Sequence, residues 1–345
     1  MQTPDSIMPA PIRLGDQALP MPVFLAPMAG ITDLPFRRMV ARFGAGLLVS
    51  EMVASTEMVT PRPSTRAAVR ARAMVAGDVP VSVQIAGREA GAMAETARIV
   101  QGMGARIVDI NMGCPAKKVT GGLSGSALMR DLDHALRLIE AVVGAVQVPV
   151  TLKMRLGWDD GSLNAPDLAR LAADAGVRML VVHGRTRAQF YKGRADWAAI
   201  RAVADLAARP PLVANGDITD ADSARAALRA SGAEAVMIGR GAQGAPWRLA
   251  QIAHLLWDRP APAIPSGRAL ADLVEEHYLD MLSFYGAELG LRVARKHLGW
   301  YADANGAALR AQMLRADTPQ AAIALIREGF ADATGRPLPV CGRAA

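Results

Sequence analysis

The sequence has few cysteines, few aromatic residues and no long apolar run. Its two cysteines, Cys114 and Cys341, are too few for a disulfide framework, so we expect a reduced, cytoplasmic setting. No charged segment with an apolar core and cleavage site opens the chain, and no apolar run reaches the ~18 residues of a membrane span. Only 4% of the residues are aromatic. Ala, Val, Leu, Ile and Met therefore supply the apolar half, which suits α/β layers better than a β-sandwich.

The length and the charge of the chain set further limits. Its 345 residues suffice for one large barrel of ~250 residues and a smaller appendage. The formal net charge is +7 and the pI is about 9.9. A basic surface attracts phosphate and releases counterions, so a nucleic-acid partner is one interpretation. Solvated helix faces are the other, because Arg alternates with Ala through much of the chain.

Eight short apolar runs follow one another along the first 241 positions. They are "VFLAPMAG", "LLVSEM", "VSVQIAG", "RIVDINMG", "VPVTLKMR", "MLVVHGRT", "PLVANGD" and "AVMIGRG". Segments with helical spacing lie between them, at Pro35–Phe43, Ala90–Met103, Asp131–Val143, Pro166–Ala175 and Asp220–Ala230. Strand and helix in alternation predict an α/β fold, a closed parallel (β/α)8 TIM barrel. An open doubly wound sheet is the rival, but "APMAGITDLPF" lacks its G-x-G-x-x-G spacing.

The pattern changes after Trp257. Residues 259–266 carry the Pro-rich "RPAPAIPS" and are predicted to be a linker. Apolar-periodic stretches follow at Gly267–Tyr285, Leu289–Ala302 and Pro319–Phe330. We therefore expect a barrel domain over residues 1–258, a small all-α domain over 267–335 and a tail over 336–345.

Polar residues fall where the predicted strands end, which is where barrels place their chemistry. Alternation in "VTLKMR" puts Thr151, Lys153 and Arg155 on one face of a strand. Leu152 and Met154 lie on the other face and would meet the helices. The same reasoning places more polar side chains at the barrel mouth: Ser82, Gln84, Asp109, Asn111 and His183. Hydrogen-bonded core residues are the alternative, although so many together are improbable, since unpaired buried polar groups are costly.

The seventh and eighth strand ends favour a bound phosphate. "ANGDI" and "IGRGAQGAPW" offer small residues and backbone N–H groups in consecutive loops, and the second leads into a short helix near Ala245. Barrels commonly hold a phosphate there, through close backbone approach and a helix N-terminus. Simple tight turns are the alternative. Arg240, within the glycine pair, argues against it.

Lys153 points to the nature of the ligand, because an inward lysine needs an anionic or strongly polar partner. A reduced flavin supplies one at its N1 and C2 carbonyl region, and Gln84 would hydrogen-bond the pyrimidine edge of the ring. A Schiff-base aldolase is the alternative use of a barrel lysine. That alternative explains neither Cys114 nor Gln84.

The stretch "DINMGCPAKKV" puts Cys114 in the loop above the barrel mouth, between Gly113 and Pro115. A thiol there can act as a nucleophile or as a general acid, and an ordinary thiol is mostly protonated at neutral pH. A small buried apolar residue is the alternative. The setting favours a proton donor.

These motifs together resemble the FMN-dependent tRNA-dihydrouridine synthases. The resemblance rests on "APMAGITDLPFR", "VQIAG", "DINMGCPAKKV", "SGSALM", "TLKMRLGW", "HGRTR", "ANGDI" and "IGRGAQGAPW", which occur in order over the whole barrel. "RVARKHLGWY" in the helical part is similar to the bacterial B-type branch. The resemblance implies reduction of selected tRNA uridines to 5,6-dihydrouridine, with FMN as cofactor and NADPH as its reductant. No metal is implied.

The resemblance also implies roles for individual residues. Cys114 would protonate C5 of the uracil while hydride reaches C6 from the flavin. Asn111 and Arg155 would hold the uracil carbonyls. The flavin ring, ribityl chain and phosphate would be held by the remaining predicted site residues: Pro27, Met28, Ala29, Gln84, Lys153, His183, Asn215, Gly216, Asp217, Gly239 and Arg240.

A basic cluster in the helical part is the expected RNA contact. Arg292, Arg295 and Lys296 share one helix face at i, i+3 and i+4 spacing, with Trp300 and Tyr301 available for packing or stacking. Two other functions stay open. One is an FMN-dependent dehydrogenase of free pyrimidines, such as dihydroorotate or dihydropyrimidine, which has no use for a polyanion-binding surface. The other is a flavin-binding regulatory protein without turnover.

Overall fold

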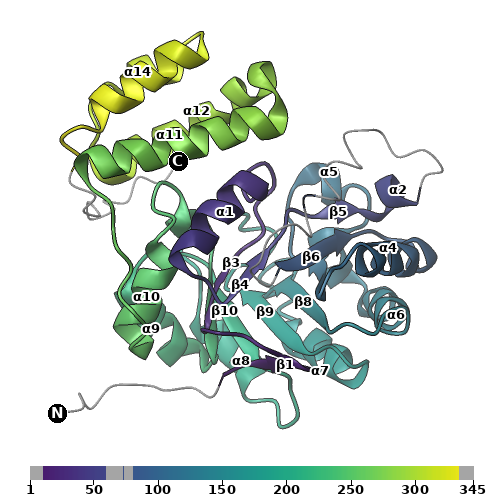
Figure 1. The fold of residues 1–345 in the computed structure, drawn as a ribbon. Helices are drawn as coiled ribbons and strands as arrows, with labels where there is room; N and C mark the ends of the chain where they lie inside the picture. The colour runs from purple at the N-terminus through teal and green to yellow at the C-terminus, as the bar shows by residue number, and fades with distance from the viewer. Residues whose placement is uncertain (1–10, 60–72, 74–80, 334–345) are drawn as a thin grey trace, which may run out of the picture.

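The computed structural model describes residues 11–59, 73 and 81–333 and contains the predicted closed parallel barrel (Figure 1). Each predicted apolar run contains one barrel strand. The strands are β3 (Val23–Leu25), β4 (Leu47–Val49), β6 (Val81–Ala86), β7 (Ile107–Met112), β8 (Val150–Arg155), β9 (Met179–His183), β10 (Leu212–Asn215) and β11 (Ala235–Ile238). Their order is β4-β3-β11-β10-β9-β8-β7-β6, and the pairing of β4 with β6 closes the ring. The short β5 (Val53–Ala54) pairs with the end of β6.

Helices follow the strands on the outside of the barrel, and the last of them, α10 (Arg248–Trp257), leads to the helical domain. The others are α1 (Leu34–Phe43), α4 (Ala90–Gly102), α6 (Leu132–Val143), α7 (Ala165–Asp174), α8 (Arg201–Ala204) and α9 (Ala221–Ser231), with short turns at α2 (Ser55–Met58) and α5 (Lys117–Thr120). Aspartate side chains cap several of them. Asp33 accepts from the N–H of Phe36, and Asp220 forms a capping box with Ser223. The predicted helix near Ala245 begins three residues later, at Arg248.

Alternation along β8 divides the barrel wall as predicted. Leu152 and Met154 are fully buried among helix residues such as Leu138 and Leu168. On the inner face, Lys153 donates to Asn215 of β10, and Thr151 donates to Asp109 of the neighbouring β7. The strand thus has an apolar outer face and a polar inner face.

A hairpin closes the N-terminal end of the barrel. The two-residue strands β1 (Arg13–Leu14) and β2 (Gln17–Ala18) pair antiparallel. Leu14 and Leu19 are buried in one cluster with Phe24 and Ile107, which stand near the starts of their strands. This end is therefore packed with apolar side chains, and the polar residues collect at the opposite end. The hairpin was not predicted from the sequence.

Four helices follow the barrel, α11 (Gly267–Tyr285), α12 (Ala287–Asn305), α13 (Arg310–Arg315) and α14 (Pro319–Gly329). Residues 258–266 before them contain neither helix nor strand. Figure 1 shows this helical domain beside α1. Its core, with Tyr278 and Phe330, also includes Met39 of α1 and Trp247 from the turn before α10. The predicted tail 336–345, with Cys341, lies outside the described residues. No helix in the described part of the chain is long and apolar enough to cross a membrane.

Candidate active site

The carboxyl ends of the barrel strands bring most of the predicted residues together. Register alone pairs Asn111 of β7 with Lys153 of β8, and His183 of β9 with Asn215 of β10. Arg155, at the end of β8, stands opposite His183. Because the strands are parallel, these side chains share one end of the barrel. The predicted gathering at the barrel mouth is therefore present.

The loop that carries Cys114 is fixed from three sides. The side-chain oxygen of Asn111 accepts from the backbone N–H groups of Gly113 (3.2 Å) and Cys114 (2.9 Å). The Arg155 Nε donates to the Gly113 carbonyl at 2.8 Å. Ser126 donates to the Cys114 carbonyl from its backbone N–H (3.1 Å) and its hydroxyl (2.8 Å). The thiol-bearing residue is itself partly exposed. Its backbone therefore has one well-defined position while its side chain stays reachable.

Arg155 is a structural as well as an electrostatic element of this loop. It is 1% exposed, and its Nη1 donates to the carbonyls of Thr186 (2.8 Å) and Phe190 (2.9 Å). Its pKa is lowered to about 10, chiefly by burial, while Tyr191 acts in the opposite direction. The described donors of Arg155 thus go to backbone carbonyls, and the Asn111 amide donates to the Gln84 side chain. Their predicted contacts with a uracil stay a prediction.

Lys153 is a partly buried cation with a neutral partner. Its Nζ donates to the Asn215 side-chain oxygen at 3.0 Å, and the Asn215 amide donates in turn to the Met237 carbonyl at 2.8 Å. Burial and then Arg155 lower the pKa of Lys153, Asp109 and Cys114 raise it, and the net value is about 8. A partly buried ammonium with no carboxylate in hydrogen-bond contact is stabilised by an electron-rich ligand. The site therefore favours such a ligand beside Lys153.

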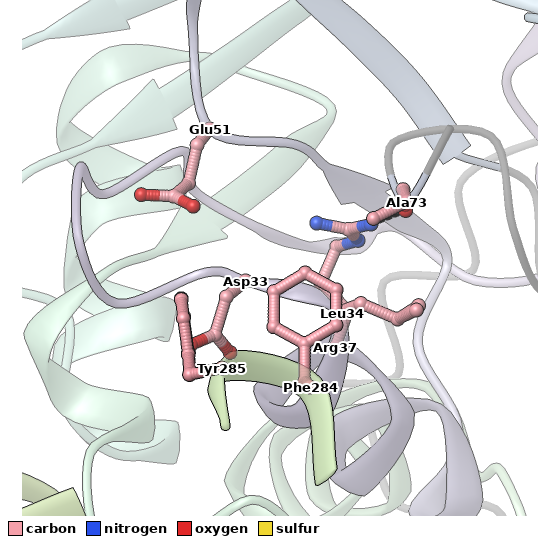
Figure 2. Close-up of a pocket in the computed structure, with 7 residues that line it drawn as sticks. All are labelled: Asp33, Leu34, Arg37, Glu51, Ala73, Phe284 and Tyr285. Carbon is pink, nitrogen blue, oxygen red and sulfur yellow. Dashed lines mark hydrogen bonds between the residues drawn. The ribbon is translucent and has the colours of Figure 1, made fainter. Parts of the chain in front are cut away.

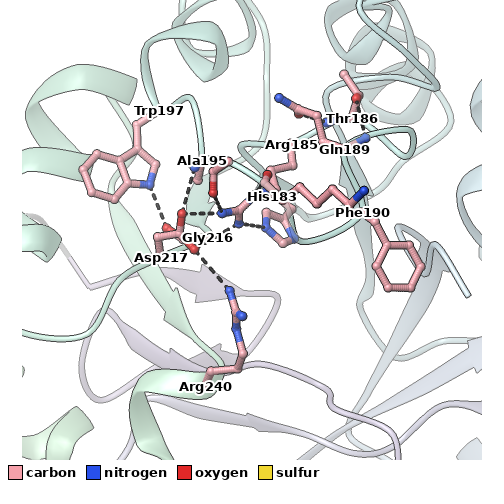
Figure 3. A network of polar contacts seen from close by, with 12 residues as sticks. His183, Arg185, Thr186, Gln189, Phe190, Ala195, Trp197, Gly216, Asp217 and Arg240 are labelled. Atoms are coloured by element: carbon pink, nitrogen blue, oxygen red, sulfur yellow. Dashed lines mark hydrogen bonds and ion pairs between the residues drawn. The ribbon is translucent and has the colours of Figure 1, made fainter. Parts of the chain in front are cut away.

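Asp217 pairs with two arginines, Arg185 from the loop after β9 and Arg240 from the loop after β11, as Figure 3 shows. Its two oxygens accept from Arg185 at 3.0 and 2.5 Å, and one also accepts from the Ala195 N–H at 2.8 Å. Arg240 approaches the same carboxylate at 3.3 Å, with its side chain 58% exposed. The carboxylate thus orients two guanidinium groups, and Arg240 reaches solvent. Arg185 lies within "HGRTR" but was assigned no role from the sequence. Its place two residues after His183 was the signal that could have identified it as a site residue.

His183 lies within this cluster as a neutral imidazole. Burial lowers its pKa well below the usual range, and the nearby cations Lys153 and Arg155 lower it further. Its Nε2 lies 3.3 Å from Nη1 of Arg185, which can only donate. Gly216 passes close to the ring: at φ +114°, an added Cβ would lie 2.8 Å from the His183 Cδ2. Only glycine fits there, because the backbone after β10 packs directly on the His183 ring and on Ala195.

The loop after β3 faces the loop after β11. It contains Pro27, Met28 and Ala29, and the Met28 N–H donates to the Thr32 hydroxyl at 2.9 Å. A Cβ on Gly239 would lie 3.5 Å from the Met28 sulfur, so the two loops are neighbours. The predicted ring-contacting and phosphate-contacting segments therefore border one region of the barrel mouth.

The helical domain touches the barrel just beyond this loop. Lys296 of α12 donates to the Gly30 carbonyl, and the Gly30 N–H donates to Glu51. In Figure 2, Asp33 and Tyr285 line a pocket with Glu51. The Tyr285 hydroxyl donates to Asp33 at 2.7 Å, and burial raises the pKa of that carboxyl to about 6. Lys296 thus points into the contact between the two domains.

The other predicted RNA-binding residues have different surroundings. The side chains of Arg292 and Arg295 are 62% and 41% exposed. Each forms an ion pair with an exposed carboxylate of its own domain: Arg292 with Glu288 at 3.6 Å and Arg295 with Asp317 at 3.9 Å. Tyr301 is only 1% exposed, with its hydroxyl 3.1 Å from His277 Nδ1. Of the two predicted uses of Tyr301, packing or stacking, the structure shows packing, because the ring belongs to the domain core.

Comparisons with known proteins agree with this geometry. A model of the family described as Dihydrouridine synthase (Dus) matches residues 24–334. The chain is 67% identical over 321 residues to a protein of Rhodobacter capsulatus named "Probable tRNA-dihydrouridine synthase", covering 93% of this chain and 98% of that protein. A protein of Rhizobium leguminosarum bv. phaseoli with the same name is 57% identical over 279 residues, covering 81% of this chain and 84% of that protein. "tRNA-dihydrouridine synthase B" of Xanthomonas axonopodis pv. citri is 47% identical over 321 residues, covering 92% of this chain and 96% of that protein. The resemblance predicted from the motifs is confirmed, and the chain belongs to the dihydrouridine synthase family.

Proposed function

We propose that this chain is a tRNA-dihydrouridine synthase, which reduces the C5=C6 bond of selected uridines in tRNA with FMN as cofactor and NADPH as reductant. The names of its relatives and the membership of the family support the reaction class. One observation supports the chemistry: Cys114 is partly exposed on a rigid loop, within electrostatic range of the cations Lys153 and Arg155. A reduced cytoplasm is the proposed setting.

The residues at the barrel mouth fit a flavin mononucleotide. Lys153 offers a partly buried cation for the electron-rich pyrimidine edge, with Gln84 nearby in the lumen. Gly216 has no side chain, so its backbone lies directly beside His183. Arg240 is exposed and can bind one terminal phosphate. Pro27, Met28, Ala29, Asn215, Asp217 and Gly239 complete the proposed binding set. A separate site for an adenylate half has no sequence signal, which favours FMN over FAD.

Cys114 supplies the proton in the proposed reaction. When bound and reduced, FMN supplies a hydride for C6 of the uracil. The Cys114 thiol donates its proton to C5, which completes the addition across the double bond. This leaves a thiolate, and the positive charges of Lys153 and Arg155 stabilise it until solvent returns a proton. The fixed backbone of the loop keeps the thiol aimed at one place.

The proposed tRNA contacts lie on α12. A uridine in folded tRNA must be extruded to reach the barrel mouth, and phosphate contacts elsewhere offset that cost. Arg292 and Arg295 are exposed enough to exchange their weak surface ion pairs for phosphate. An enzyme for free pyrimidines would not use such a surface. Retention of tRNA by the purified protein at moderate salt therefore distinguishes the two functions.

The decisive experiment is Cys114→Ala, followed by stopped-flow flavin absorbance. The variant should bind FMN and accept hydride from NADPH at the normal rate, because neither step needs the thiol. Reoxidation of the reduced enzyme by tRNA should slow by about 10² to 10⁴-fold, the usual contribution of a general acid. Cys341→Ala serves as the matched control and should leave both half-reactions unchanged. Normal reoxidation by tRNA in the Cys114 variant would refute the assignment.

A further inference from the structure

A chain of hydrogen bonds runs from the interior of the barrel to the loop of Cys114. Asp109 accepts from the Gln84 Nε2 at 2.6 Å, and the Gln84 Oε1 accepts from the Asn111 Nδ2 at 2.7 Å. The Asn111 Oδ1 then accepts from the backbone N–H groups of Gly113 and Cys114. Three side chains on β6 and β7 thus join a buried carboxylate to the loop that carries the proposed proton donor.

The hydrogen bonds in this series can be arranged with only one order of donors and acceptors. Backbone N–H groups can only donate, so Asn111 must present its oxygen to the loop and its amide nitrogen to Gln84. Gln84 must then accept with its oxygen and donate with its nitrogen. The group at the far end must be an acceptor, and Asp109 is one. The residue types at both ends therefore agree on a single orientation for the two amides in between.

Burial makes each of these bonds matter. Asp109 is 2% exposed, Gln84 1% and Asn111 7%. Little solvent is present to replace a lost partner, and an unpaired amide in such a place is costly. The second oxygen of Asp109 accepts from the Thr151 hydroxyl at 2.6 Å, which holds the carboxylate itself in place.

We propose that Asp109 is a positioning residue for Cys114, acting through Gln84 and Asn111. This rests on the proposed function of Cys114 as proton donor. Asp109 has no described hydrogen bond to the loop itself; it fixes the amide of Gln84, which fixes Asn111, which holds the two backbone N–H groups. Without an acceptor at position 109, Gln84 turns toward another partner and Asn111 loses its own. Arg155 and Ser126 still hold the loop, so the effect is partial.

Two substitutions separate this role from simple structural support. Asp109→Leu removes the acceptor. Asp109→Asn keeps one, because its oxygen can face Gln84 while its amide donates to the Thr151 hydroxyl, which rotates to accept. In protein saturated with FMN, we expect Asp109→Leu to slow single-turnover reoxidation by tRNA about tenfold and to slow reduction by NADPH much less, whereas the affinity for FMN falls because Asp109 also contacts Gln84 and acts on Lys153. Asp109→Asn should stay within about twofold of the parent protein.

A second measurement does not depend on the reaction. In a Cys341→Ser background Cys114 is the remaining thiol, and its alkylation by iodoacetamide without FMN reports how well the loop is held. Asp109→Leu should raise this rate several-fold, and Asp109→Asn should not. The proposal is overturned if Asp109→Leu alkylates and reoxidises like the parent protein. It is also overturned if FMN-saturated Asp109→Leu slows both half-reactions equally, or if Asp109→Asn is as impaired as Asp109→Leu. If Asp109→Leu does not fold, the Asp109→Asn comparison still decides. If the parent protein does not reduce tRNA, the proposed function fails, while the alkylation rates still test the loop.

Discussion

Gly244 is the position at which one added methyl group should disturb the contact between the two domains. It lies in the turn between β11 and α10, with φ +70°. An added Cβ would lie 2.9 Å from the backbone nitrogen of Tyr301 and closer still to the Trp300 carbonyl, both in α12. The Gly244 carbonyl also accepts from the Asn305 side chain at 2.9 Å. The turn therefore packs directly on helix backbone, which cannot move aside as a side chain can.

The expected cost of Gly244→Ala has two parts. An L-residue in the left-handed region costs about 1–2 kcal/mol. Overpacking against a rigid neighbour adds about 1–3 kcal/mol. Gly193→Ala is the matched control, since Gly193 has φ +65° and nothing within 4 Å of its added Cβ. It should show the first part alone, so the free energy of unfolding of the two variants should differ by about 1–3 kcal/mol.

Urea unfolding followed by circular dichroism measures this difference, and both variants should unfold with the slope of the parent protein. Binding of tRNA provides a second signal, since a shifted α12 displaces Arg292 and Arg295. Equal loss of stability in Gly244→Ala and Gly193→Ala would refute the reasoning, because the close packing of this turn on α12 would then contribute nothing.

The remaining predictions concern FMN and tRNA binding. Because Lys153 is protonated below its pKa of about 8, the affinity of the apoprotein for FMN should fall as the pH rises through that value. Fluorescence titration of Lys153→Met should show about tenfold weaker binding at pH 7 and no such dependence; an unchanged pH profile contradicts the assignment. Replacing Arg292 and Arg295 with Ala should lower the log-log salt slope of tRNA binding by up to ~2. Lys296→Met should change this slope less, since Lys296 faces Gly30. A slope that the double variant leaves unaltered would show that the two arginines do not contact tRNA phosphates.

The barrel was predictable because each of its strands is apolar and ends in polar or Gly-containing residues. Alternation in β8 placed Lys153 correctly in the lumen. The hairpin at Arg13–Ala18 escaped prediction because strands of two residues have no measurable period. The six-residue α13 is missed for the same reason. Short elements of this kind depend on tertiary contacts that a local pattern does not contain.

Individual roles at the site were less predictable than the site itself. Spacing put Arg292, Arg295 and Lys296 on one helix face, but only the docking of α12 against the barrel turns Lys296 toward Gly30. In the same way, the pairing of Asp217 with Arg185 depends on two loops that are distant in sequence. Sequence patterns locate residues along an element. Their partners follow from how the elements pack.

The shared core of the two domains fixes the distance between α12 and the barrel mouth. Met39 and Trp247 of the barrel are buried among helical-domain residues such as Leu270 and Leu298, so separating the domains would expose apolar surface from both. Separation of the two domains therefore costs free energy, although residues 258–266 alone would allow a hinge. For a folded RNA held on α12, the span to the barrel mouth is then set by the protein. The choice of uridine becomes a matter of which nucleotide lies at that span from the bound phosphates, and lengthening 258–266 should not alter it.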